Sequence, residues 1–174
     1  MKGGWAATSG GNILTAIHWL DKQLIKRRFF MSANSVLKSL TDTAFDSVEG
    51  YRKAAEKADS PQLKKALNER LQKREQTVSQ LNAEIQRQGG DLVTKGTMTG
   101  EVHQAFLSIS DAFENGDEAA AERVEEGEDY LKGKFKDALE DDDLDPQSRA
   151  VVQQCYAEIS EGEQFGDMIE RQHG

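Results

Sequence analysis

The sequence has little of what many small folds depend on. It contains one cysteine, Cys155, and two prolines among 174 residues, and aromatic residues make up 7% of the chain. A single cysteine excludes an internal disulfide and any cysteine-based zinc site, and it fits a reducing compartment, so we expect a cytoplasmic protein. Few prolines and aromatics argue against a β-sandwich or barrel. No apolar run is long enough to span a membrane.

Positive charge is also in short supply. Acidic residues number 31 and basic residues 22, which gives a formal net charge of −9. DNA, RNA and anionic membranes are therefore poor partners for the body of the protein. The length predicts one domain, and the 30% of charged residues is typical of a small helical bundle with long exposed faces.

The clearest pattern present is a helix over residues 61–88. Its apolar residues recur at alternating spacings of four and three, which predicts one buried stripe: Leu63, Leu67, Leu71, Val78, Leu81 and Ile85. Ser60 is placed to cap it, Pro61 occupies its first position, and Gly89 follows its last turn. Arg74 interrupts the stripe at mid-helix, which indicates a polar group inside a bundle.

Four further segments have helical periodicity. The sequence predicts long helices over residues 34–58, 117–140 and 146–174, and a short one over residues 100–114. Asn34 is placed to cap the first of these. The very short turn at Asp59-Ser60 makes the first two helices antiparallel neighbours. We therefore predict an all-α, ferritin-like four-helix bundle, built from two antiparallel helical hairpins with a short extra helix in the crossover.

Residues 1–30 differ from the rest. A glycine-rich opening is followed by an apolar and then basic segment, which is the reverse of the order in a secretory signal. We favour translation from Met31, with residues 1–30 a non-native or disordered extension and residues 31–174 the bundle domain. A basic amphipathic membrane helix is the alternative for the first segment.

Each long helix carries a glutamate near its midpoint: Glu49, Glu75, Glu128 and Glu163. Ferritin-like di-metal proteins use one Glu on each of two helices and Glu-x-x-His on the other two. A carboxylate-ligated iron or manganese site is thus one hypothesis, although Val78 and Gly166 stand where the histidines are due.

The other hypothesis for the centre is a structural ion pair, and we favour it. Among the four glutamates only Glu128 falls squarely on its apolar stripe, and Arg74 lies on the stripe of the second helix. Burying either charge alone would be costly, so we expect the two to pair. Cys155 lies on a helical stripe with no histidine near it in sequence, which predicts a core thiol. No catalytic constellation or phosphate-binding loop is found.

Several stretches together carry a family resemblance: SVLKSLTDTAFDSVEGYRKAAEK, LNAEIQRQGGD, GEVHQAF, VEEGEDYLKGKFKDALE and VVQQCYAEI. From about Ser35 to Gln172 the chain resembles a bacterial ferritin-like four-helix-bundle family, domain-of-unknown-function family 2383. The resemblance implies the fold and no established activity. Its members often carry a His near Gly162–Glu163, where this chain has none, which weighs against a histidine-assisted metal site.

These observations lead to two functional expectations. We expect a non-enzymatic soluble bundle without cofactors that acts as a homodimer or through a protein partner, and Gly162 and Gly166 would allow close helix approach. The alternative is an iron or manganese protein linked to oxidative stress or metal handling, with Glu49, Glu75, Glu128 and Glu163 as ligands.

Overall fold

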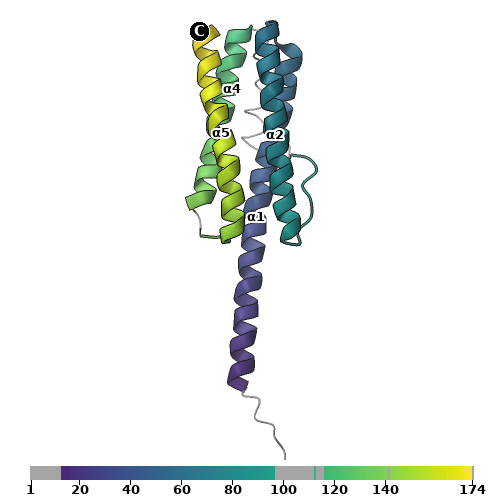
Figure 1. Cartoon of the computed structure of the whole chain (residues 1–174), viewed down its shortest axis with the longest axis vertical. Coiled ribbons are helices and arrows are strands. Elements are labelled where there is room, and N and C mark those ends of the chain that lie inside the picture. The colour runs from purple at the N-terminus through teal and green to yellow at the C-terminus, as the bar shows by residue number, and fades with distance from the viewer. Residues whose placement is uncertain (1–12, 97–111, 113–115, 141, 174) are drawn as a thin grey trace, which may run out of the picture.

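The computed structural model describes residues 13–96, 112, 116–140 and 142–173, and these residues contain four long helices and no strand (Figure 1). The helices are α1 (Ile13–Lys57), α2 (Pro61–Arg87), α4 (Asp117–Glu140) and α5 (Pro146–His173). The prediction of an all-α chain with four long helices is confirmed. The short helix predicted over residues 100–114 lies almost entirely outside the described residues.

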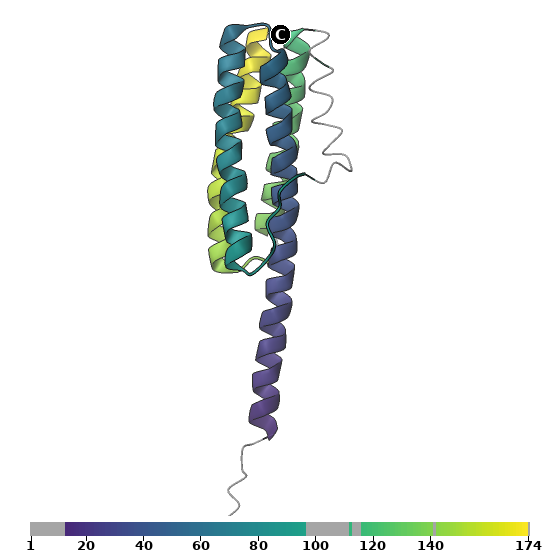
Figure 2. The ribbon, with the colours of Figure 1, turned by 90° about the vertical axis from the view of Figure 1, so that its right-hand side faces the viewer.

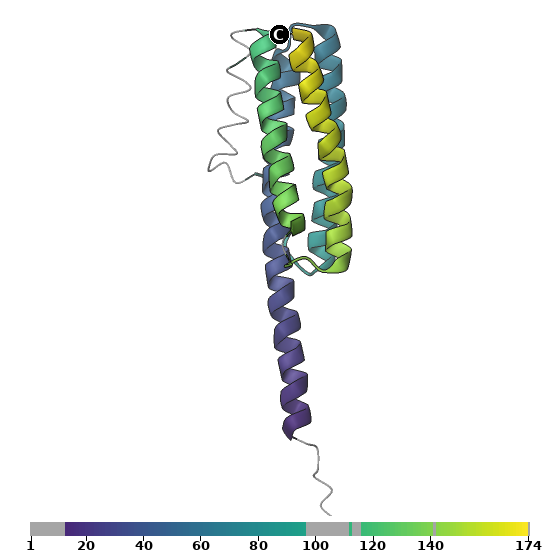
Figure 3. The same cartoon turned by 90° about the vertical axis from the view of Figure 1, so that its left-hand side faces the viewer.

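The helices pack as two antiparallel hairpins side by side. α1 packs on α2 and α4 on α5, while α2 also contacts α5 and α1 also contacts α4. The carboxylate of Asp117, at the start of α4, accepts hydrogen bonds from the backbone N–H groups of Asp59 (3.1 Å) and Ser60 (3.0 Å). α4 therefore begins at the end of the bundle where α1 turns into α2, and α2 and α4 run in the same direction (Figures 2 and 3).

The predicted limits of the second helix are confirmed at both ends. Pro61 is its first residue, and the Ser60 side chain accepts a hydrogen bond from the N–H of Leu63 at 3.3 Å. α2 ends at Arg87, and Gly89 adopts a φ of 74°, a left-handed conformation that glycine reaches without strain.

The predicted start of the first helix is wrong. α1 begins at Ile13 and passes through Asn34, which the sequence suggested as a cap. The reason is that neither proline nor glycine occurs between Ile13 and Val48, so nothing in the backbone chemistry ends the helix before Asn34. Asn34 instead lies against Gly90, where a Cβ atom would lie 2.5 Å from the Asn34 amide nitrogen.

The first part of α1 projects beyond the other three helices as a single rod (Figure 1). Leu24, on this rod, is 63% exposed. No helix within the described part of the chain is long and apolar enough to cross a membrane.

Two apolar clusters fill the bundle above and below its middle. The cluster nearer the projecting rod contains the larger side chains, among them Leu37, Leu81, Leu131, Phe135, Val152 and Ile159. The cluster nearer the α1–α2 turn is richer in alanine and includes Ala54, Ala55, Leu63, Leu67, Val124 and Ile169. Between the two clusters each helix places a polar residue or a glycine inward: Ser47, Arg74, Glu128 and Gly162. These residues and their hydrogen-bond partners form a polar layer, which is the candidate site.

Candidate functional site

Arg74 and Glu128 form the centre of the polar layer. Arg74 lies on α2 between Leu67 and Val78, and Glu128 lies on α4 between Val124 and Leu131, so helical spacing carries both charges into the core. Their side chains are 0% and 1% exposed. These two side chains are therefore as buried as the apolar clusters on either side of them.

The predicted ion pair between Arg74 and Glu128 is confirmed. Nη2 of Arg74 donates to both carboxylate oxygens of Glu128, at 3.1 and 2.9 Å. Nη1 of Arg74 donates to Ser47 Oγ on α1 at 2.8 Å, and its Nε donates to Glu158 Oε2 on α5 at 3.3 Å. One guanidinium thus connects all four helices, with each of its three nitrogens donating to a different residue.

The electrostatics keep this arginine charged. Burial lowers the pKa of Arg74, but the negative charges of Glu128 and Glu158 outweigh it and raise the pKa above its ordinary value. The guanidinium also lies 5.8 Å from the centre of the Tyr51 ring. The pKa of Tyr51 is raised mainly by burial and then by the charge of Glu128, so its phenol stays neutral.

A second arginine completes the layer. Nη2 of Arg70 donates to the backbone oxygen of Glu158 at 3.0 Å and to its carboxylate at 2.6 Å. Thr77 Oγ1 donates to the other carboxylate oxygen of Glu158 at 2.9 Å. The four core charges, two arginines and two glutamates, balance to zero. Two buried polar atoms of this layer, Arg70 Nε and Tyr51 Oη, have no hydrogen-bond partner among the residues that the structure describes.

Sequence reasoning missed Arg70, Glu158, Ser47 and Tyr51 as members of this layer. One signal was present, because Arg70 precedes Arg74 by four residues and so shares a helix face with it. Glu158 directly precedes the apolar Ile159, and no pattern in the neighbouring sequence predicts that its side chain faces α2.

The two glycines of α5 make room for the charges. A Cβ atom at Gly162 would overlap Glu128 Oε2 and would lie 2.6 Å from Arg70 Nη2. At Gly166 it would lie 3.0 Å from the Cα atom of Glu125, on the backbone of α4. Their small size therefore serves close approach inside the bundle, between α5 and its neighbours.

The structure does not bring the four predicted metal ligands together. Glu49 and Glu75 are 57% and 52% exposed and both bind Arg52, Glu75 at 3.2 Å. Glu163 pairs with Lys132 at 2.5 Å, and Glu128 is the buried partner of Arg74. Among residues 13–96, 112, 116–140 and 142–173, no group of three His, Cys, Asp or Glu side chains is placed to hold a metal ion.

Cys155 is a buried thiol next to this layer, as predicted. Burial and then the charge of Glu158 raise its pKa to about 12, so the thiolate that a nucleophile requires is not formed near neutral pH. Its Sγ donates to Gln80 Oε1 at 3.5 Å. The thiol packs with the apolar cluster nearer the rod.

A second polar cluster joins the end of α2 to the start of α5. Glu84 is 4% exposed and accepts hydrogen bonds from Arg87 Nε at 2.9 and 2.8 Å and from Ser148 Oγ at 2.6 Å. Asp145 caps α5 by accepting from the N–H of Ser148 at 3.2 Å, and Arg87 also reaches it. This cluster fixes the register of the two helices at that end.

Comparison with known proteins identifies the chain at the level of a family. No curated protein and no solved structure matches it. One family model matches residues 32–141, which is more than half of the chain. These residues include all of α2 and α4 and the bundle part of α1, and with them Arg74 and Glu128. The chain therefore belongs to the family described as domain of unknown function DUF2383.

Proposed function

We propose that this protein is a non-enzymatic helical bundle that acts through association with a second copy or with a protein partner. One observation carries the proposal: the carboxylate at the centre of the bundle, Glu128, has both oxygens bound to Arg74. A carboxylate held in this way is not available to ligate a cation or to exchange a proton with a substrate. Glu158, the other glutamate of the layer, is likewise bound to Arg70 and Thr77.

We infer a ferritin-like connection and a bacterial origin for the bundle. Helices α2 and α4 run in the same direction, so the end of α2 and the start of α4 lie at opposite ends of the bundle, as the single long crossover of that fold requires. The resemblance supplies the bacterial part of the inference. In place of the di-metal centre common in such bundles, this chain has the charge-balanced layer around Arg74.

We also propose that residues 31–174 are the functional unit and that it resides in the cytoplasm. The match to the family begins at residue 32. The absence of a second cysteine, and hence of an internal disulfide, fits a reducing compartment.

Metal binding is the first test, because it separates this proposal from an iron or manganese protein. Elemental analysis of protein purified without a metal-binding tag is followed by anaerobic titration with ferrous iron. We expect no metal above the level bound by a Glu75→Gln, Glu163→Gln double variant, which removes two of the four predicted ligands and leaves the core pair intact. About two metal ions per chain, lost in Glu128→Gln, would overturn the proposal.

Association is tested by sedimentation of the 1–174 and 31–174 chains over a range of concentrations. We expect both to associate to the same extent, because the proposal assigns association to the bundle. A strictly monomeric 31–174 chain that also captures no protein from a lysate of its source would remove the main support for this function.

A further inference from the structure

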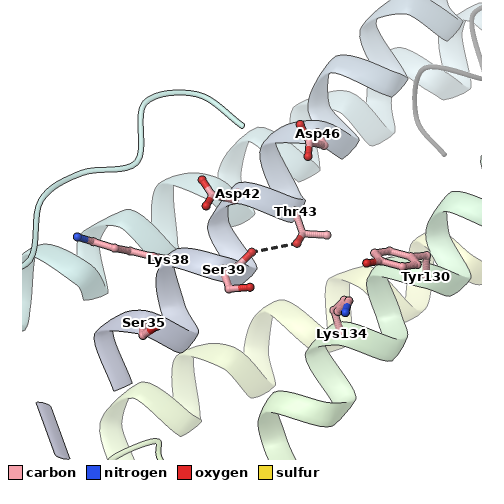
Figure 4. Close-up of a pocket in the computed structure, with 8 residues that line it drawn as sticks. All are labelled: Ser35, Lys38, Ser39, Asp42, Thr43, Asp46, Tyr130 and Lys134. Carbon is pink, nitrogen blue, oxygen red and sulfur yellow. Dashed lines mark hydrogen bonds between the residues drawn. The ribbon is translucent and has the colours of Figure 1, made fainter. Parts of the chain in front are cut away.

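A polar pocket lies on the outside of the bundle, between α1 and α4 (Figure 4). It extends along α1 from Ser35 to Asp46 and is closed on the other side by Tyr130 and Lys134 of α4. Its volume is about 390 Å³, which is within the range of small-molecule sites. The pocket is separate from the buried layer around Arg74 and shares no lining residue with it.

The walls of the pocket alternate in charge. Lys38 and Asp42 lie four residues apart on α1, and Lys38 lowers the pKa of Asp42 while burial, the larger effect, raises it. Across the pocket the Lys134 ammonium lies 5.2 Å from the centre of the Tyr130 ring. The Asp42 side chain is half-buried and the Lys134 side chain is exposed, so a ligand in the pocket can reach both.

Hydroxyl groups lie between these charges. Thr43 Oγ1 donates its proton to the backbone oxygen of Ser39 at 2.9 Å, which leaves its lone pairs as acceptors (Figure 4). The Ser39 side chain is exposed, and its hydroxyl can donate and accept. The pocket therefore presents donors and acceptors at short intervals, with one aromatic ring.

This pattern selects among classes of ligand. Two lysines and two aspartates line the pocket, Lys38, Lys134, Asp42 and Asp46, so its formal charges cancel and favour neither an anion nor a cation. An apolar molecule would keep water away from these charges without replacing its hydrogen bonds. A hydroxyl group both donates and accepts, so a molecule with several hydroxyls can satisfy a carboxylate and an ammonium in turn. We propose that this pocket binds a neutral polyhydroxylated small molecule of the size of a sugar.

The proposal is tested by ¹H–¹⁵N chemical shifts of the full chain during titration with glucose, myo-inositol and trehalose. We expect saturable shifts of the backbone amides of Ser39, Thr43 and Tyr130 with at least one of them. No saturable shift with any of the three polyols would overturn the proposal. Larger responses to inorganic phosphate or to putrescine than to the polyols would do so too, because they would indicate an anion or a cation site.

Variants show whether the shifts report this pocket. Asp42→Asn and Lys134→Ala each remove one charged partner, and each is expected to weaken binding about tenfold. Lys136→Ala is the matched control, since Lys136 is an exposed lysine of α4 that does not line the pocket. Equal affinity in Lys134→Ala and Lys136→Ala would place the ligand elsewhere and overturn the proposal. If one pocket variant fails to fold, the other decides the outcome.

Discussion

Two ion-pair groups in this bundle have nearly the same chemistry and opposite surroundings. In the core, Arg74 of α2 pairs with Glu128 and Glu158, and the side chains of Arg74 and Glu128 are 0% and 1% exposed. On the surface, Arg52 of α1 pairs with Glu49 and with Glu75 of α2, and its side chain is 40% exposed. Each group is centred on one arginine that pairs with two glutamates, although in the core Arg70 also binds Glu158. Solvent exposure is the main difference between the two central arginines.

That difference changes what each group contributes. Surface pairs are screened by water and salt and typically contribute less than about 1 kcal/mol. In the core, desolvation offsets much of the attraction, so the intact group adds little stability, but removing one partner leaves a charge without solvent. The core group therefore favours the one packing of the four helices in which its buried charges are paired. The surface group adds only a weak contact to that packing.

The largest effect is expected from Glu128→Ala. The substitution leaves the Arg74 guanidinium buried without its bidentate partner, so we expect the free energy of unfolding to fall by about 3–5 kcal/mol. Urea unfolding followed by circular dichroism measures it. Glu75→Ala is the control. It also removes the carboxylate from an arginine–glutamate pair between two helices, but this pair lies at the surface.

Replacing the pair together sharpens the same prediction. In Arg74→Met, Glu128→Leu no charge of the pair remains to be desolvated, so stability is expected to return close to that of the original chain. Equal destabilisation in the single and the double variant would mean that lost packing volume, not an unpaired charge, explains the loss.

Gly162→Ala is expected to have the next largest effect. Its added methyl group would overlap Glu128 Oε2 and crowd Arg70, so the buried charges must shift, at a cost of about 1–3 kcal/mol. Gly133→Ala provides the matched control: this glycine is exposed on α4 and has no atom within 4 Å of the added position. It should stabilise the helix by up to about 1 kcal/mol, because alanine favours helix over glycine. Thermal unfolding that moved in the same direction for both variants would contradict this account.

A pH dependence should come from the second cluster, at the end of α2. Burial raises the pKa of Glu84, but hydrogen bonds from Arg87 and Ser148 outweigh it and hold this pKa below the ordinary value of 4.5. A depressed pKa stabilises the folded state above pH 4.5, and this contribution is lost as the pH falls through the folded-state value. The free energy of unfolding of Glu84→Gln should therefore fall less steeply than that of the original chain as the pH drops. Urea unfolding from neutral pH to about pH 3 measures this. Parallel curves for the two proteins would refute the assignment.

The sequence predicted those features of the bundle that follow from the pattern of a single helix. The limits of α2 follow from Ser60, Pro61 and Gly89, and the burial of Arg74 and Glu128 follows from their places on apolar stripes. Two opposite charges that are both buried must meet, so their pairing could be inferred without knowing how the helices pack.

What the sequence did not predict depends on the packing of one helix on another. Glu158 meets Arg70 and Arg74 only because of the register between α5 and α2, which no local pattern encodes. Glu49 and Glu75 were candidate ligands because they lie near the middle of their helices, but both lie off the apolar stripes and are at the surface with Arg52, a pairing that depends on how α1 packs on α2. The predicted start of α1 was wrong for a different reason. Asn34 is a residue type that caps helices, but no residue before it breaks the helix, which therefore continues through it.

The smallest effect should come from Arg52→Ala, which breaks the surface group. Its partners remain in water, so we expect a loss of less than about 1 kcal/mol in the free energy of unfolding, and less still as salt rises. Arg74→Ala, measured beside it, should cost several times more and respond little to salt, because its partners are shielded from ions. If the two variants were equally destabilised and equally sensitive to salt, water would have to reach the polar layer. A hydrated layer would leave Glu128 and Glu158 open to exchange with solvent, and the argument against chemistry at the centre of this bundle would lose its physical basis.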